Sequence, residues 1–168
     1  MRSHTMEQVL QPIDRFYDSV ARNPDAAAIA GSGQGDITYA ELGLAVAALG
    51  AALQDIDSTP GGRVGICAGN TIDHLLALLA TYAAGKVWVP LNPRNARADL
   101  DAMIATTSPS IIVADAAYVE RFTLGSARLI VAGSDAGTET VQALVSAWAG
   151  TTPSRSRVGS TRSPAESR

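Results

Sequence analysis

The sequence predicts an α/β protein built on a doubly wound, mostly parallel sheet with helices on both faces. From residue 63 onward, short apolar runs typical of strands alternate with helical patterns. Glycine, proline or aspartate bounds each run, as expected for strands buried on both faces. Right-handed crossovers between such strands would place helices on both sides of the sheet.

From residue 63 onward, each helix and strand is predicted from the residues at its ends. Asn70 is predicted to cap a helix and Gly85 to end it, because asparagine suits an N-cap and glycine the left-handed residue after a helix. The predicted strands span residues 63–68, 87–90, 110–114 and 128–132, and the predicted helices span 71–84, 97–107, 115–122 and 138–148.

The preceding residues predict a helix, a hairpin and a second helix. The helix spans residues 10–22, and two short apolar runs, 26–30 and 37–39, flank the turn GSGQGD. Thr38 and Glu41 then have the spacing of a capping box. The long helix that follows contains many alanines with Gly43 and Gly50, which predicts that it packs very close to a neighbour.

The chain divides into three parts by composition. Residues 1–5 are interpreted as a leader or an expression remnant, and residues 6–150 as the α/β subdomain. Residues 151–168 read TTPSRSRVGSTRSPAESR and carry a net charge of +3, against −6 for residues 1–150. This basic tail has too little apolar surface to offset the cost of ordering, so it is predicted to be disordered.

Composition also limits the partners and the compartment. The net charge of −3, and a tail whose arginines have no aromatic neighbours, argue against nucleic acid. The longest apolar run, residues 75–85, is about half the ~20 residues that a membrane span needs, so no span is predicted. The single Cys67 permits no disulfide within the chain, which suits a reducing cytoplasm. Its apolar surroundings predict a buried, unreactive thiol.

The search for chemistry assigns no catalytic, cofactor-binding or metal-binding residue. The glycine clusters lack the spacing of phosphate-binding loops, and no His/Cys cluster has metal-ligand spacing. His74 is interpreted as a helix-surface or capping residue, with a general base as the alternative. Arg94 and Arg97 are interpreted as surface arginines, although they could reach an anion.

Four landmarks nevertheless fall in a familiar order. ITYAEL at 37–42 resembles "(L/I)TYxEL", and RVGI at 63–66 with Asn70 resembles "D-x-V-A-I-x-x-x-N". AGKVWVPLNP at 84–93 resembles "GAxxVPLNP", with Lys86 where that pattern usually has alanine, and SIIVAD at 110–115 is similar to the strand that follows. Over about residues 10–148 the chain thus resembles the adenylate-forming enzymes, which include acyl-CoA synthetases, nonribosomal adenylation domains and luciferases.

The resemblance implies both a function and what this chain lacks. Such an enzyme converts a carboxylic acid and ATP to an acyl-adenylate and then to a thioester, using Mg and coenzyme A. Its ATP loop, of the form YTSGTTGxPKG, and its later motifs do not occur in these 168 residues. We therefore expect the N-terminal portion of an acyl-CoA synthetase of the fatty-acid–CoA ligase type, inactive alone and binding no cofactor. Its end would be a shifted reading frame or an engineered truncation.

Two alternatives remain at this stage. One is a non-catalytic module that self-associates through an apolar face left exposed by the missing part of the enzyme. The other is an unrelated flavodoxin-like binding domain, which residues 68–71 (AGNT) support poorly as a phosphate-binding turn.

Overall fold

The computed structural model describes residues 11–31, 35–133 and 139–154, which form two compact units. The described residues up to Gly43 form the first unit, and those from Leu44 onward form the second. The proposed leader, most of the basic tail and part of the hairpin turn lie outside the described residues.

The first unit contains helix α1 (Pro12–Arg22) and a hairpin of β1 (Ala27–Ile29) and β2 (Ile37–Thr38). Pro12 occupies the first turn of α1, where its missing N–H costs no hydrogen bond. The antiparallel pairing of Ala27 with Thr38 confirms the predicted hairpin.

The predicted capping box starts helix α2 (Tyr39–Ile56). The Thr38 N–H donates to Glu41 Oε2 over 2.8 Å, and the Glu41 N–H donates to Thr38 Oγ1 over 3.2 Å. The Thr38 hydroxyl also donates to Glu41 Oε2, over 2.9 Å, and the two bonds that the carboxylate accepts from Thr38, the backbone one foremost, lower the pKa of Glu41. The prediction of close packing is also confirmed. A Cβ on Gly43 would lie 3.1 Å from Val20 Cγ1, and one on Gly50 would lie 3.4 Å from Ala83 Cβ.

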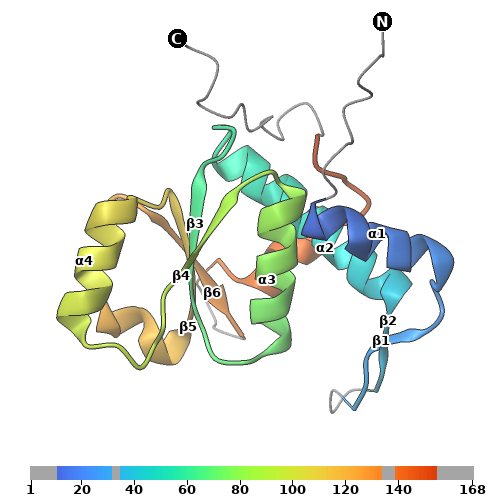
Figure 1. Ribbon diagram of the computed structural model, residues 1–168, viewed down its shortest axis with the longest axis horizontal. Helices are drawn as coiled ribbons and strands as arrows, with labels where there is room; N and C mark the ends of the chain where they lie inside the picture. The colour runs from blue at the N-terminus through green and yellow to red at the C-terminus, as the bar shows by residue number, and fades with distance from the viewer. Residues whose placement is uncertain (1–10, 32–34, 134–138, 155–168) are drawn as a thin grey trace, which may run out of the picture. The chain divides into compact units, whose positions relative to one another are not determined.

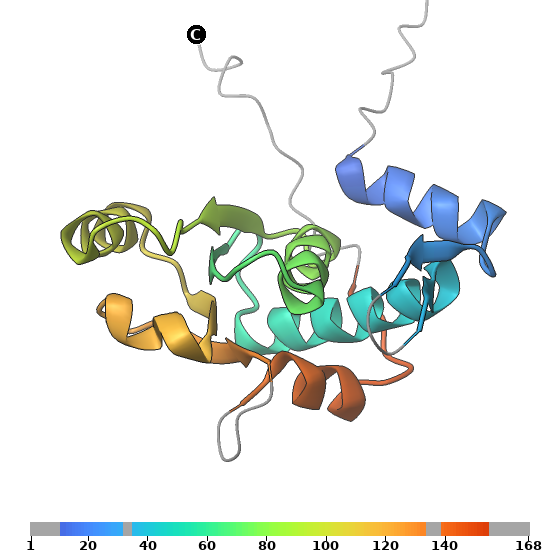
Figure 2. The same cartoon turned by 90° about the horizontal axis from the view of Figure 1, so that it is seen from below.

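The second unit contains a four-stranded parallel sheet in the order β4-β3-β5-β6, as the sequence predicts. Helices α4 and η1 cover one face, and α2, α3 and α5 lie on the other (Figures 1 and 2). The strands are β3 (Arg63–Cys67), β4 (Val87–Pro90), β5 (Ile111–Asp115) and β6 (Arg128–Ala132). The helices are α3 (Ile72–Ala83), α4 (Arg97–Thr107), η1 (Ala116–Arg121) and α5 (Val141–Ala147).

Several predicted boundaries are wrong. Strand β3 ends at Cys67, β5 includes Asp115, which was predicted to begin the next helix, and η1 is a 3-10 helix that spans Ala116–Arg121. Two further differences concern helix caps. Thr71, not Asn70, caps α3, because its backbone is extended and its hydroxyl accepts a hydrogen bond from the His74 N–H over 3.2 Å. The last helix begins at Val141, with Thr140 as its cap, so residues 139 and 140 precede it. Residue 138 lies outside the described residues. Gly85 does follow α3 in the left-handed conformation, at φ 66°, as predicted.

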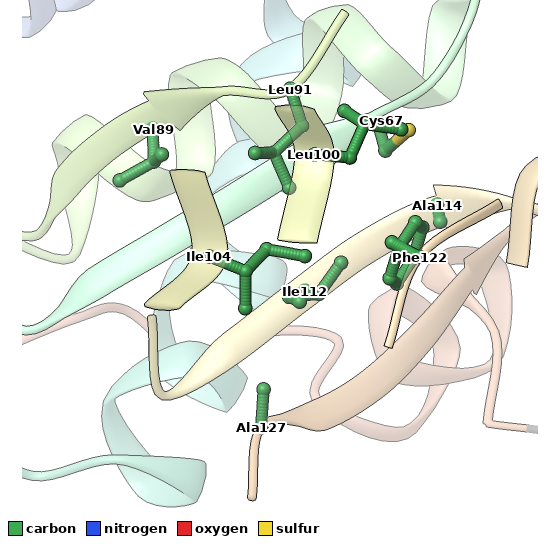
Figure 3. Close-up of a cluster of buried hydrophobic side chains, with 9 residues drawn as sticks. All are labelled: Cys67, Val89, Leu91, Leu100, Ile104, Ile112, Ala114, Phe122 and Ala127. Atoms are coloured by element: carbon green, nitrogen blue, oxygen red, sulfur yellow. The ribbon is translucent and has the colours of Figure 1, made fainter. Parts of the chain in front are cut away.

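A cluster of buried apolar side chains fills the space between the sheet and the α4 face (Figure 3). Leu100 and Ile104 of α4 face Ile112 of β5 and Val89 of β4. Cys67 belongs to this cluster and is fully buried. The alternation of strand side chains between this cluster and the other face is what makes the sheet buried on both sides.

Helix α2 meets the length and composition expected of a membrane span, which the sequence analysis overlooked. Counting unbroken apolar runs missed it, because Glu41 and Gln54 interrupt a window whose mean hydropathy is 1.2. In the structure 56% of that window is buried within the protein, and a buried core helix passes the same test. The absence of a span thus stays a prediction.

Candidate functional site

The carboxyl edge of the sheet is where a ligand is expected. In the order β4-β3-β5-β6 the chain moves from β3 first to one side and then to the other. The connections after β3 and β5 therefore run to opposite faces, which opens a crevice at their carboxyl ends in sheets of this kind. The groups that line this edge decide what it can bind.

The turn after β3 is held by an acid and a histidine. Asp115, at the end of β5, accepts the Gly69 N–H over 2.8 Å. His74 Nδ1 lies 2.8 Å from the Gly69 carbonyl oxygen, and since a carbonyl only accepts, this nitrogen carries the proton. His74 therefore holds the turn from the first turn of α3, while Thr71, and not His74, caps the helix.

This turn does not fit the phosphates of ATP. A phosphate cradle needs backbone N–H groups that are free to donate. Here the Gly69 N–H already binds the Asp115 carboxylate, and the His74 N–H binds Thr71. The negative charge of Asp115 would also repel a phosphate at close range. Among the described residues, no group of three His, Cys, Asp or Glu side chains could hold a metal ion such as Mg.

A second acidic residue, Asp73, links elements at the carboxyl edge of the sheet. Asp73, in the first turn of α3, accepts the Gly133 N–H over 2.6 Å through Oδ2. Its other oxygen accepts a hydrogen bond from Gln142 Nε2 of α5 over 2.7 Å. Asp73 thus joins α3 to the end of β6 and to α5, so its carboxylate is used for structure.

Exposed arginines flank the other end of this edge. Arg97 donates to the Glu120 carbonyl over 3.0 Å, and Arg121 donates to the Asn95 carbonyl over 3.2 Å. These two bonds join η1 to the start of α4 and to the loop before it. Arg94 and Arg97 are exposed, as predicted for surface arginines. Arg121 could not be found from the sequence, because only the fold brings η1 beside that loop.

Cys67 is unsuited to nucleophilic chemistry. Burial, together with the nearby Asp115 carboxylate, raises the pKa of its thiol to about 11. The reactive thiolate is therefore scarce at neutral pH. The prediction of a buried cysteine is confirmed, and that of an unreactive thiol stays a prediction.

The strongest charged cluster lies at the opposite, amino edge of the sheet. Lys86, just before β4, has a side chain only 2% exposed, and its Nζ lies 3.2 Å from Asp57 Oδ2. The same ammonium donates to the Thr59 carbonyl over 3.1 Å, and Ser110 Oγ donates to Asp57 Oδ2 over 2.6 Å. Burial raises the pKa of Asp57, but hydrogen bonds from Ser110, Thr59 and Lys86 outweigh it and bring the pKa to about 2.

Sequence reasoning missed this cluster. It noted Lys86 only as a lysine where the GAxxVPLNP pattern usually has alanine. Its members precede three different strands and are far apart in the chain. We define Asp57, Lys86 and Ser110 as the amino-edge lock. It joins the segment before β3 to the starts of β4 and β5. Every polar group in it is hydrogen-bonded, which is typical of a structural network.

The family model for AMP-binding enzymes matches residues 16–164, so the chain belongs to this family. The match extends past residue 148, where the resemblance was expected to end. It also removes the alternative of an unrelated flavodoxin-like domain.

Curated relatives include synthases and synthetases much longer than this chain. The chain is 37% identical over 101 residues to the phenyloxazoline synthase MbtB of Mycobacterium sp. (strain MCS), covering 60% of this chain and 9% of that protein. It is 30% identical over 128 residues to the hybrid PKS-NRPS synthetase fsa1 of Fusarium sp. (strain FN080326), covering 76% of this chain and 3% of that protein. The chain thus spans a small part of the length of these relatives.

Solved structures share the fold. A benzoate CoA ligase from Burkholderia xenovorans LB400 superimposes with a TM-score of 0.74 at 22% identity, over 85% of this chain and 29% of that one. The four-stranded α/β unit is therefore the N-terminal subdomain architecture of adenylate-forming enzymes.

Proposed function

We propose that this chain is the N-terminal portion of an acid–thiol ligase of the acyl-CoA synthetase type. The longer enzyme would join a carboxylic acid to AMP from ATP, release pyrophosphate, and then transfer the acyl group to a thiol. The observation that carries the proposal is the family match over residues 16–164. The fold likeness to a benzoate CoA ligase supports the choice of coenzyme A as acceptor.

In this proposal the described residues act as scaffold. The carboxylates of Asp73, Asp115 and Asp57 are committed to hydrogen bonds that hold the sheet together. Activation of an acid by ATP needs groups that stabilise the negative charge on the oxygens of the reacting phosphate. The turn after β3 does not fit ATP phosphates. We therefore assign no step of the reaction to a residue of this chain.

The names of the relatives favour a second candidate for the acceptor. Relatives at 30–37% identity are a phenyloxazoline synthase and a hybrid PKS-NRPS synthetase. These names support an adenylation domain that passes its acyl or aminoacyl group to a thiol on a carrier protein. Both candidates share the adenylation step and differ only in the thiol.

The test is to sequence the source gene through and past codon 150, translate all three frames, and express the longest product. Adenylation is measured as acid-dependent exchange of pyrophosphate into ATP over a panel of fatty, aryl and amino acids. Thioester formation is then measured with coenzyme A and, separately, with a pantetheine-bearing carrier protein. Exchange followed by transfer to coenzyme A supports the first candidate, and transfer only to the carrier supports the second. A long product that gives no exchange with any acid would overturn both.

The self-association predicted from the sequence stays a proposal, and the structure bears on how it would occur. The outward edge of β4 carries Pro90, which has no N–H to offer a further strand. At β6 the Val131 N–H already binds the Glu139 carbonyl. Association would therefore use exposed apolar side chains such as Val87, which is 49% exposed. Light scattering across concentrations tests this, and a monomer throughout would contradict it.

A further inference from the structure

The segment that leaves α5 is bound to α2 by one buried side chain. Gln54 is only 5% exposed although its side chain is polar. Its Nε2 donates to the Ser154 carbonyl over 3.1 Å, and its Oε1 accepts the Ser154 N–H over 2.8 Å. The amide thus pairs with both backbone groups of one residue, in the way that a neighbouring strand would.

The same amide reaches a third segment. Gln54 Nε2 also donates to the Ala84 carbonyl over 3.1 Å, at the C-cap of α3. The Gln54 side chain therefore joins α2 to the end of α3 and to the residues after α5. A buried amide held on both its atoms fixes the backbone it binds, because a buried polar atom left unpaired is costly.

The surface of α2 is shaped to receive this segment. Gly50 lies one helical turn before Gln54, and a Cβ there would come within 3.4 Å of Pro153 Cγ. The Thr151 N–H donates to the Trp148 carbonyl over 3.0 Å, which turns the chain at the end of α5. Trp148, Asp55 and Thr152 line a hollow of about 230 Å³ beside the same segment.

We propose that Gln54 is a positioning residue that holds residues 151–154 as a strap across α2. The strap fixes the point at which the chain leaves the four-stranded unit. In the longer enzyme it would set where the following part begins, a consequence that rests on the proposed function. The strap itself does not depend on that function, because all of its contacts lie within this chain.

The experiment is ¹⁵N relaxation on the 168-residue chain, with the Thr152 amide as reporter. Gln54→Leu removes the amide, and Ser154→Pro removes the N–H that Gln54 accepts without touching the core. Ser154→Ala keeps that N–H, and Gln142→Leu removes a glutamine bond at the other edge of the sheet, so both serve as controls. The order parameter of Thr152 is expected near about 0.85 in the native chain and both controls, and below about 0.6 in the two test variants.

Two results would overturn the proposal. One is a Thr152 order parameter below about 0.6 in the native chain. The other is an order parameter that stays at its native value in Ser154→Pro. Because Ser154→Pro alters only the strap, a failure of Gln54→Leu to fold leaves this second test intact. Neither readout involves ATP, so failure here is distinguishable from failure of the proposed function.

Discussion

The two edges of the parallel sheet use charged residues in opposite ways. At the amino edge, the Lys86 ammonium is almost fully buried and bonded to Asp57 and to backbone carbonyls. At the carboxyl edge, Asp73 and Asp115 are half-buried, and each binds a backbone N–H. The first edge holds an ion pair away from water, whereas the second fastens loops and keeps them open to solvent.

This difference explains which edge is available for function. Removing one partner of a buried ion pair leaves an uncompensated charge, so the amino edge tolerates little change. Loops at the carboxyl edge lose only individual hydrogen bonds when altered. Sheets of this topology bind ligands at the carboxyl edge. The more fragile edge is therefore the one opposite the edge where such sheets bind ligands.

The largest expected effect comes from breaking the amino-edge lock. Lys86→Met should lower the free energy of unfolding by about 3 kcal/mol, because Asp57 loses its ion-pair partner in a poorly solvated site. Urea unfolding measures it. Arg128→Met is the matched control, since its ion pair with Glu139 is more than half exposed on the arginine and should be worth under about 1 kcal/mol. Equal losses in the two variants would remove the contrast between buried and exposed pairs.

A smaller loss is expected from crowding the same lock. A Cβ on Gly62 would lie 2.2 Å from Asp57 Oδ2 and 3.0 Å from Lys86 Nζ. Gly62→Ala should therefore displace the pair and cost about 2 kcal/mol. Gly125→Ala is the control, because a Cβ there meets nothing within 4 Å and only its φ of 62° is unfavourable. The idea fails if Gly62→Ala is no more harmful than Gly125→Ala in thermal unfolding.

Acid should weaken the amino edge in a defined pH window. The pKa of Asp57 is about 2 in the folded chain and 3.8 ordinarily, so the unfolded state binds the proton first as pH falls. The stabilisation is complete above pH 3.8 and is lost as pH falls through about 2. Asp57→Asn should flatten the dependence of unfolding free energy on pH in this window. An unchanged slope in the variant would show that other carboxyl groups cause the loss.

The smallest effect is expected at the carboxyl edge. Asp73→Ala removes the acceptor of the hydrogen bonds from the Gly133 N–H and from Gln142 Nε2. Both donors are exposed, so water can take the place of the carboxylate. The free energy of unfolding should therefore fall by only about 1 kcal/mol. Asp99→Ala is the control, because Asp99 also lies in the first turn of a helix and so shares any effect of the helix dipole. Urea unfolding of both should show a larger loss for Asp73. A loss as large as that of Lys86→Met would reverse the ranking of the two edges.

Local patterns predicted most of the fold. The capping box at Thr38, the glycine after α3 and the apolar strand runs depend on neighbours in sequence, and the structure confirms them. The prediction of Asn70 as the cap was wrong, because Asn70 and Thr71 can both accept the N–H and only the backbone angles, which the sequence does not show, decide for Thr71.

The contacts that distinguish the edges could not be predicted. Lys86 and Asp57 lie 29 residues apart, and Gln54 and Ser154 lie 100 residues apart. Only the strand order brings such residues together. For the same reason a search for clusters along the sequence found no site, although the fold gathers charged groups at both edges.

We propose above that the described residues are scaffold. Their charged side chains stabilise the sheet and take no part in transferring AMP from ATP to an acid. The most direct measurement is acid-dependent exchange of pyrophosphate into ATP by the purified 168-residue chain, over the same panel of acids and beside the longer gene product. We predict no exchange above background with any acid. Exchange that requires both the chain and a carboxylic acid would contradict this account.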